Sequence, residues 1–362
     1  MLKKFLSDIK PLDAAAMESA QARLDNLVKP PGSLGGLENI AVRLSGISGA
    51  SHNEISKRCV FVFTSDNGVV EEGVSAAPQT VTYLQALNIT KGIAGVSVLA
   101  KQFHADLIVV DVGINADIEN IAILSKKIRK STWNIARQPA MTRDEAVKAL
   151  LIGVETVTDA VGNGYKLIGV GEMGIGNTTT SAAVLCALLG LPPVQIAGKG
   201  AGLSEEKYMH KLKVIQMALE RNKPDPADPI DVLAKVGGFD IAAMAGAYIG
   251  AAKCRVPVVI DGFISIVAAL CAAKLCPLTK DYMFASHASF EQGYKTAADA
   301  LGVTPYLHLG MRLGEGSGCP LMFALIDAAC AIMQNMGTFE QGNIDEKYLE
   351  GVRDADFHIR GL

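Results

Sequence analysis

Short apolar runs alternate along this chain with longer segments of helical periodicity, and this order limits the possible folds more than any other feature. The short runs are rich in β-branched and aromatic residues and lead into glycines or acids; they occupy residues 59–64, 107–112, 166–170 and 256–260. The helical patterns occupy residues 83–102, 142–162, 177–190, 203–221, 240–253 and 262–274. Such alternation predicts an α/β fold, with a mostly parallel sheet and helices on both of its faces.

The two ends of the chain do not continue this alternation. A helix is expected over 12–28, where the sequence Lys-Pro-Pro-Gly at 29–32 stops it. Near the other end, expected strands at 282–285 and 306–309 precede a long apolar helix over 321–336. We therefore predict a large α/β domain over 30–336 and a small helical domain made from residues 1–29 and 337–362.

Composition excludes several classes of protein. The chain is 49% hydrophobic and 20% charged, which supplies a large buried core. Its 34 basic residues against 37 acidic ones give a formal net charge of -3, so no basic field exists to hold a nucleic acid. The most apolar stretch, 256–273, is interrupted by Pro257, Asp261 and Gly262, which argues against a membrane span.

The cysteines and the first residues predict a cytoplasmic protein without a metal site. The 7 cysteines are scattered, with no Cys-x-x-Cys pair and no zinc-like spacing to histidines. They are typical of small core residues in a reducing compartment. Asp8 interrupts the basic start before any apolar stretch long enough for a signal peptide.

A glycine-rich turn within 167–181 leads from an expected strand into an expected helix. Gly174 and Gly176 let backbone amides approach a ligand, and Asn177 and Thr178 begin the helix, where unpaired amides and the helix dipole favour an anion. The sequence therefore predicts a phosphate site here. The alternative is a turn that only packs the helix against the strand.

Two common phosphate motifs are disfavoured at this turn. Gly169, Gly171 and Gly174 have the spacing of the dinucleotide fingerprint, but that motif needs an acid about 20 residues on. Asp and Glu are absent from 173–204, which disfavours a nicotinamide-dependent oxidoreductase. Gly171 and Gly176 have the glycine spacing of a P-loop, yet Asn177 follows where lysine is required, which disfavours a nucleoside triphosphatase.

Three aspartates lie at or just after the ends of expected strands, at the predicted ligand edge of the sheet. Asp66 follows the first strand and Asp111 lies at the end of the second, and each is either a site residue or a simple turn former. Asp261 separates a strand from a helix, where it either caps the helix or accepts hydrogen bonds from ribose hydroxyls.

Glu315 stands between two glycines in the segment Gly-Met-Arg-Leu-Gly-Glu-Gly-Ser-Gly at 310–318. A carboxylate on such a turn neither builds a helix nor covers a surface, so we favour a group presented to a ligand. The alternative is a turn acid paired with Arg312 or solvated. His287 and His308 also lie near strand ends, and we expect both to be hydrogen-bonded structural residues because no acid neighbour marks a catalytic pair.

These residues resemble the nicotinate-nucleotide:dimethylbenzimidazole phosphoribosyltransferase family of cobalamin assembly. The matching stretches occur in order along nearly the whole chain and are together far more specific than any one alone: KPPGSLGGL at 29–37, SDNGVV at 65–70, GVS at 73–75, 171–180, GKGAGL at 198–203, DGF at 261–263 and GMRLGEGSG at 310–318.

The resemblance implies a fold, an assembly and a reaction. The fold is a Rossmann-like sheet of six parallel strands flanked by helices, with a small domain built from both chain ends. The assembly is a homodimer with sites near the interface. In the reaction, nicotinate mononucleotide and a benzimidazole-like base give an α-riboside 5′-phosphate and nicotinate, and no cofactor or metal is involved.

The resemblance also assigns site residues, position by position. Glu315 matches the general base of the family. Nucleotide binding is assigned to Glu172, Gly174, Gly176, Asn177, Thr178, Lys211, which meets the phosphate, and Asp261, which belongs to the ribose and nicotinate pocket. Base binding is assigned to Gln85, Ala77 and Leu313.

The chain departs from the family pattern at positions that bear on the base. Asn67 stands where the family commonly has His, and Lys199 where it has Arg, while Ala76 and Ala77 make the expected base pocket small and apolar. Phenolic and purine bases therefore stay open beside benzimidazoles. A heteromer with a paralogue and a non-catalytic nucleotide-binding subunit stay open as well.

Overall fold

The computed structural model describes residues 2–200, 202–345 and 349 and contains one parallel sheet. Its six strands have the order β3-β2-β1-β4-β5-β6, and every neighbouring pair is parallel. The strands are β1 (Arg58–Ser65), β2 (Asp106–Gly113), β3 (Ile123–Ser125), β4 (Leu167–Met173), β5 (Val258–Ile260) and β6 (Met283–Ala285). The strand order reverses between β1 and β4, and ligands bind outside the carboxyl ends of strands at such a point.

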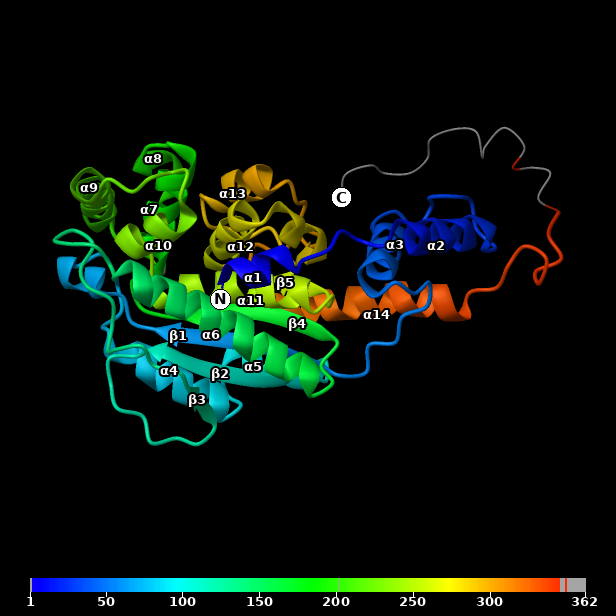
Figure 1. Ribbon diagram of the computed structural model, residues 1–362, viewed down its shortest axis with the longest axis horizontal. Coiled ribbons are helices and arrows are strands. Elements are labelled where there is room, and N and C mark those ends of the chain that lie inside the picture. Colours follow the sequence, from blue (N-terminus) through cyan, green and yellow to red (C-terminus); the bar gives the residue numbers. More distant parts are fainter. Residues whose placement is uncertain (1, 201, 346–348, 350–362) are drawn as a thin grey trace.

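Helices cover both faces of the sheet, which confirms the predicted α/β fold (Figure 1). On one face α11 (Phe239–Lys253) contacts β1, β2 and β4, and α6 (Arg143–Gly162) packs on α11. On the other face lie α4 (Thr80–Thr90), α5 (Gly95–Gln102) and α14 (Cys319–Asn335). Because both faces are covered, the central strands are continuous apolar runs, and the side chains of 59–63 in β1 are fully buried.

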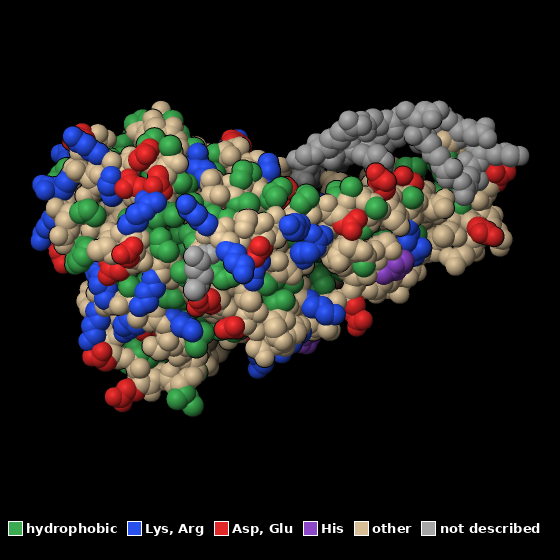
Figure 2. Space-filling model, viewed as in Figure 1, with side chains coloured by type: hydrophobic (Ala, Val, Ile, Leu, Met, Phe, Trp, Pro, Cys, Tyr) green, Lys and Arg blue, Asp and Glu red, His purple; other side chains and the backbone are tan. Residues whose placement is uncertain are grey.

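The other helices surround this core. They are α1 (Leu2–Ser7), α2 (Ala14–Asn26), α3 (Gly36–Ser48), α7 (Asn177–Leu189), α8 (Pro193–Ile196), α9 (Glu205–Asn222), α10 (Pro229–Val236), α12 (Phe263–Leu275), α13 (Tyr294–Leu301) and the 3-10 helices η1 (Gly68–Glu72) and η2 (Pro277–Tyr282). Lysines and arginines are interspersed with acids over the face shown in Figure 2, so surface charge does not mark a ligand site there.

α2, α3 and the end of α14 meet beside the main body, whereas α1 packs on α11 and α6 of the main body itself. In Figure 1, α2, α3 and the far end of α14 form an arm, and the backbone of Leu27 bridges to that of Thr338 in antiparallel fashion. The amide of Phe339 donates to the carbonyl of Asn26 at 3.2 Å. α3, which we placed in the large domain, packs on α2 and α14. The division into 30–336 and the two ends stays a prediction, and residues 346–348 and 350–362 of the expected small domain lie outside the described residues.

Two predicted elements are wrong in detail. The expected helix over 83–102 is two helices, α4 and α5, because the chain turns at Gly92, whose φ of 80° lies in the left-handed region. The expected strand over 306–309 is reduced to one bridge, between His287 and Leu307, since Pro305 and Gly310 stand at its two ends. The three-residue edge strand β3 and several helices were not predicted: α1, α3, α8, α10, α13, η1 and η2.

Glycines allow α6 and α11 to pack with their backbones in contact. A Cβ atom built on Gly153 of α6 would lie 1.9 Å from the carbonyl oxygen of Ala243, and one on Gly246 of α11 would lie 1.9 Å from that of Leu150. Side-chain atoms essentially never come so close to a carbonyl. The close packing of α6 on α11 therefore depends on glycine, which has no side chain, at positions 153 and 246.

Gly246→Ala should destabilise the protein by about 1 to 3 kcal/mol, because the methyl group forces the helices apart. Alanine favours a helix over glycine by about 1 kcal/mol, so propensity alone predicts the opposite sign. Gly162→Ala, at the end of α6, is the matched control, since its Cβ would meet nothing within 4 Å. Urea denaturation gives both free energies of unfolding; equal stabilities for the two variants would contradict this account.

Candidate active site

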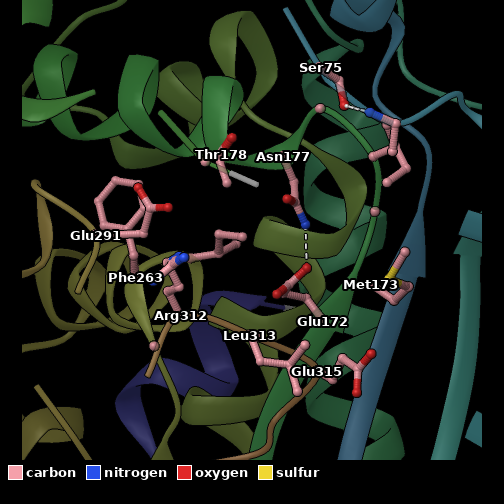
Figure 3. A pocket seen from close by; sticks show the side chains of 18 of the residues that line it. Ser75, Glu172, Met173, Asn177, Thr178, Phe263, Glu291, Arg312, Leu313 and Glu315 are labelled. Carbon is pink, nitrogen blue, oxygen red and sulfur yellow. Dashed lines mark hydrogen bonds between the residues drawn. The ribbon is translucent and has the colours of Figure 1, made fainter. Parts of the chain in front are cut away.

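A cavity of about 330 Å³ lies at the carboxyl ends of β4 and β5. Its walls come from α4, the turn between β4 and α7, the turn between β5 and α12, and the segments around 287–291 and 312–315. Figure 3 shows Glu315 and Leu313 toward one end, Glu172 and Asn177 in the middle, and Glu291 and Arg312 toward the other end. Every residue that the sequence assigned to the site lines this cavity: Ala77, Gln85, Glu172, Gly174, Gly176, Asn177, Thr178, Lys211, Asp261, Leu313 and Glu315.

The glycine-rich turn after β4 opens the start of α7 to the cavity. Gly176 is the N-cap of α7, with a φ of 95°, and its lack of a side chain leaves the first turn without a side-chain cap. Gly174 packs so tightly that an added Cβ would lie 2.2 Å from the carbonyl oxygen of Ser65. Both glycines are thus required by geometry, and the positive end of the helix dipole faces the cavity.

A buried lysine lies beside this helix start. Lys211 projects from α9, is 1% exposed, and donates from Nζ to Thr178 Oγ1 at 2.9 Å and to the carbonyl oxygen of Gly198 at 3.1 Å. Burial lowers the pKa of Lys211 to about 8, while the nearby Glu291 opposes that shift. Lys211 and the start of α7 together form a pocket suited to an anion.

Carboxyl groups crowd the middle of the cavity wall. Burial, and next the charge of Asp240, raise the pKa of Glu172 to about 8, and burial raises that of Asp240 to about 6. The side-chain amide of Asn177 donates to Glu172 Oε2 and, at 3.2 Å, to Asp240 Oδ2. Glu172 is therefore mostly protonated at neutral pH.

Glu315 lies on a turn of left-handed backbone and is held by two donors. Its φ is 64°, and the residue is buried in the cavity wall. Gln85 Nε2 donates to Oε1 at 2.6 Å, and the amide of Val96 in the first turn of α5 donates to Oε2 at 3.2 Å. The predicted alternative, a pair with Arg312, is not formed, because that guanidinium lies over the ring of Phe290.

Asp261 binds backbone amides of the Glu315 turn. Oδ2 accepts from the amide of Gly316 at 3.0 Å, and Oδ1 accepts from that of Gly318 at 2.7 Å. Burial raises the pKa of Asp261 to about 7 in spite of these amides. The capping alternative is wrong, since the N-cap of α12 is Gly262 and has no side-chain cap.

Of the other predicted polar residues, one lines the cavity and three lie outside its lining. Asp111 Oδ1 accepts from the amides of Gly113 and Ile114, and Asp66 Oδ2 accepts from that of Asn115, so both build turns outside the cavity lining. His287 lines the cavity, and burial lowers its pKa to about 4, which makes it neutral. His308 is not part of the lining.

Sequence reasoning missed several wall residues. Some are apolar, and others are polar groups on segments without a motif: Val81, Met173, Phe263, Ile264, Ser265, Ser289 and Glu291. For most of them the residue type carries no sign of ligand binding, and only their position beside a motif residue could have indicated it. Within the described residues, no cluster of three His, Cys, Asp or Glu side chains is arranged for a metal, and no helix has the length and apolar character needed to cross a membrane.

Comparisons with known proteins agree on one family. The model of a family described as phosphoribosyltransferase matches residues 9–344. A nicotinate-nucleotide–dimethylbenzimidazole phosphoribosyltransferase of Clostridium perfringens is 53% identical over 359 residues, which is 99% of each chain. The protein of that name from Clostridium tetani is 50% identical over 355 residues, which is 98% of each chain.

The fold is similar to that of a solved structure from the same group. The crystal structure of the phosphoribosyltransferase of this name from Thermus thermophilus has a TM-score of 0.87 and 39% sequence identity. The match covers 92% of the present chain and 99% of the other. The likeness therefore extends over the sheet and most of the helices around it.

Glu172 should make the wild-type protein less stable as pH rises, and the Glu172→Gln variant should not show this decrease in the free energy of unfolding. The raised pKa means that the native state binds a proton more tightly than the unfolded state, so the free energy of unfolding falls as pH rises from about 4.5 through about 8. Glutamine cannot ionise. The melting temperature of the variant relative to wild type should rise by a few degrees between pH 5.5 and pH 8.5, and a difference that stays constant over this range would contradict the raised pKa.

Proposed function

Because this chain belongs to the nicotinate-nucleotide–dimethylbenzimidazole phosphoribosyltransferase family, we propose that it transfers ribose 5′-phosphate from nicotinate mononucleotide to 5,6-dimethylbenzimidazole or a related base. The products are nicotinate and an α-riboside 5′-phosphate. The observation that carries the proposal is the placement of Glu315, which faces the same cavity as the glycine turn and Lys211. A proton acceptor and an anion pocket thus share one cavity.

Glu315 acts as the general base of the transfer. The nicotinate ring of the nucleotide is already a cationic pyridinium, so it leaves with the bonding electrons of C1′–N and needs no acid. The nucleophilic nitrogen of the base forms the new bond on the opposite face of C1′, which inverts the β configuration to α. As that bond forms, Glu315 takes the proton of the second ring nitrogen, so that the product is neutral at the ring.

The nucleotide is held at the other end of the cavity. The 5′-phosphate binds Lys211, the hydroxyl of Thr178 and the amides at the start of α7, next to Gly174 and Gly176. Glu172 and Asn177 lie between the two ends, beside the expected ribose and nicotinate position, where Asp261 also forms part of the wall.

The incoming base occupies the end of the cavity formed by Gln85, Ala77 and Leu313. Gln85 donates to Glu315 at 2.6 Å, so the base enters beside an acceptor that is already oriented. The preferred base follows from an assay with nicotinate mononucleotide and a panel of benzimidazoles, purines and phenols, with products separated by mass. Release of nicotinate with none of them would refute the proposed function.

The assembly we propose is a homodimer whose interface lies beside this cavity. Large apolar side chains are exposed next to the base end: Leu84 on α4 at 52%, Ile93 before α5 at 68% and Leu313 at 57%. Covering them is favourable in proportion to the apolar area removed from water. Light scattering should give twice the chain mass for wild type and a smaller mass for Ile93→Glu; a monomeric wild type would contradict the dimer.

The protein acts in the cytoplasm in this proposal. Its 7 cysteines are all free, and most of them are buried, as expected where thiols stay reduced. Fractionation of cells that express the full chain tests this location, and recovery outside the cytoplasm would contradict it.

Glu315→Gln should lower kcat by about 10² or more while nicotinate mononucleotide still binds, because glutamine keeps the shape but cannot accept a proton. Lys211→Met is the matched contrast: it should raise KM for the nucleotide more than KM for the base. Steady-state kinetics with a benzimidazole measures both. Wild-type turnover in the glutamine variant would remove Glu315 from the reaction.

A further inference from the structure

Glu315 itself has a backbone conformation that a residue with a side chain disfavours. Gly314, Glu315 and Gly316 have φ values of 81°, 64° and 86°, three left-handed residues in succession. Glycine adopts this region freely, but glutamate carries a Cβ that disfavours it. Such a conformation persists where surrounding groups hold it, so the groups that contact the turn determine where the carboxylate lies.

Both oxygens of Asp261 bind this turn from the sheet side. They accept from the amides of Gly316 and Gly318, at 3.0 Å and 2.7 Å, and the residue is 1% exposed. One oxygen thus binds the amide of the residue directly after Glu315, and the other binds the amide two residues further on. Only the ionised carboxylate can accept at both oxygens without presenting a proton.

Asp261 is itself anchored in the sheet. Its amide donates to Ser265 Oγ at 3.1 Å, and that hydroxyl donates to the carbonyl oxygen of Val170 in β4 at 2.8 Å. The hydroxyl of Tyr248 on α11 lies 2.6 Å from the same Ser265 oxygen. A continuous series of hydrogen bonds therefore connects the buried core to the Glu315 turn.

The turn also has little room to move toward the sheet or along it. A Cβ on Gly171 of β4 would lie 2.3 Å from the Gly316 amide nitrogen, and one on Gly318 would lie 2.3 Å from His287 Nδ1. Release of the two amides would therefore let the turn move only outward, away from Gly171 and toward the cavity. Such a movement changes the geometry of the two hydrogen bonds that Glu315 accepts from Gln85 and from the amide of Val96.

We propose that Asp261 is a positioning residue for the transfer reaction: by binding the amides of Gly316 and Gly318, it holds the left-handed turn that sets the Glu315 carboxylate against Gln85 and the Val96 amide. This inference rests on the proposed role of Glu315 as general base. In this inference Asp261 affects the reaction by placing Glu315, and not by contacting the ribose or the nicotinate directly.

Asp261→Asn tests this role, because the amide group accepts at one position only and presents a donor at the other. We expect kcat to fall by about 10- to 100-fold, since a displacement of about 1 Å can cost 10²-fold, and Kd for nicotinate mononucleotide to stay within about threefold. Asp111→Asn is the matched control, because Asp111 is also 1% exposed and accepts two backbone amides at a strand end, outside the cavity. It should leave kcat unchanged.

A double variant separates action through Glu315 from action elsewhere. In the Glu315→Gln background, Asp261→Asn should lower kcat by no more than about threefold, because the group that it positions has already been removed. Losses that multiply would overturn the inference, as would a loss confined to nucleotide binding, which would make Asp261 a ribose contact.

Hydrogen exchange of the Gly316 and Gly318 amides reports on the turn whether or not the reaction is as proposed. Exchange in a peptide spanning 310–320 should be faster in Asp261→Asn than in wild type or Asp111→Asn. Unchanged exchange would overturn the inference, whereas failure of wild type to release nicotinate would overturn only the proposed reaction. Ser265→Ala, which removes the anchor of Asp261, gives the same readouts with a smaller expected effect should Asp261→Asn fail to fold.

Discussion

The close approach of two backbones, at Gly171 in β4 and Gly316 in the Glu315 turn, is the constraint on which the cavity depends. A side chain at Gly171 would displace this turn, and with it the wall that faces the anion pocket. The same approach brings the amides after Glu315 within reach of Asp261 at the end of β5. The parallel sheet thus supplies both the floor of the cavity and the groups that fix its wall.

Charge is distributed along the cavity in a way that matches a nucleotide with a cationic base. One end has Lys211 and the positive start of α7, which suit a phosphate. The middle and the other end contain the carboxyl groups of Glu172, Asp261 and Glu315, which favour a pyridinium and a developing oxocarbenium ion when they are ionised. Because burial raises the pKa of Glu172 and Asp261, a bound cation would draw these groups toward their ionised forms.

The sequence was informative where local chemistry determines structure and less so where distant packing does. The strand runs, the glycine turn before Asn177 and the glycine-flanked Glu315 each have a local cause, and each was predicted. The edge strand β3 has only three residues and exists through pairing with β2, so no run of its own indicates it. Likewise, the contact of Asp261 with Gly318 joins two segments far apart in the chain, and no spacing predicts it.

The antiparallel bridge between Leu27 and Thr338 has a consequence for the order in which the protein forms during synthesis. The arm of α2 and α3 is among the first segments to leave the ribosome, yet the helix and backbone that complete it are among the last. Before α14 is added, the apolar faces of the arm and the part of the sheet that α14 covers both lack their partner. A nascent chain therefore passes through a stage in which the strands are present but this apolar surface is exposed, and chaperones can bind it.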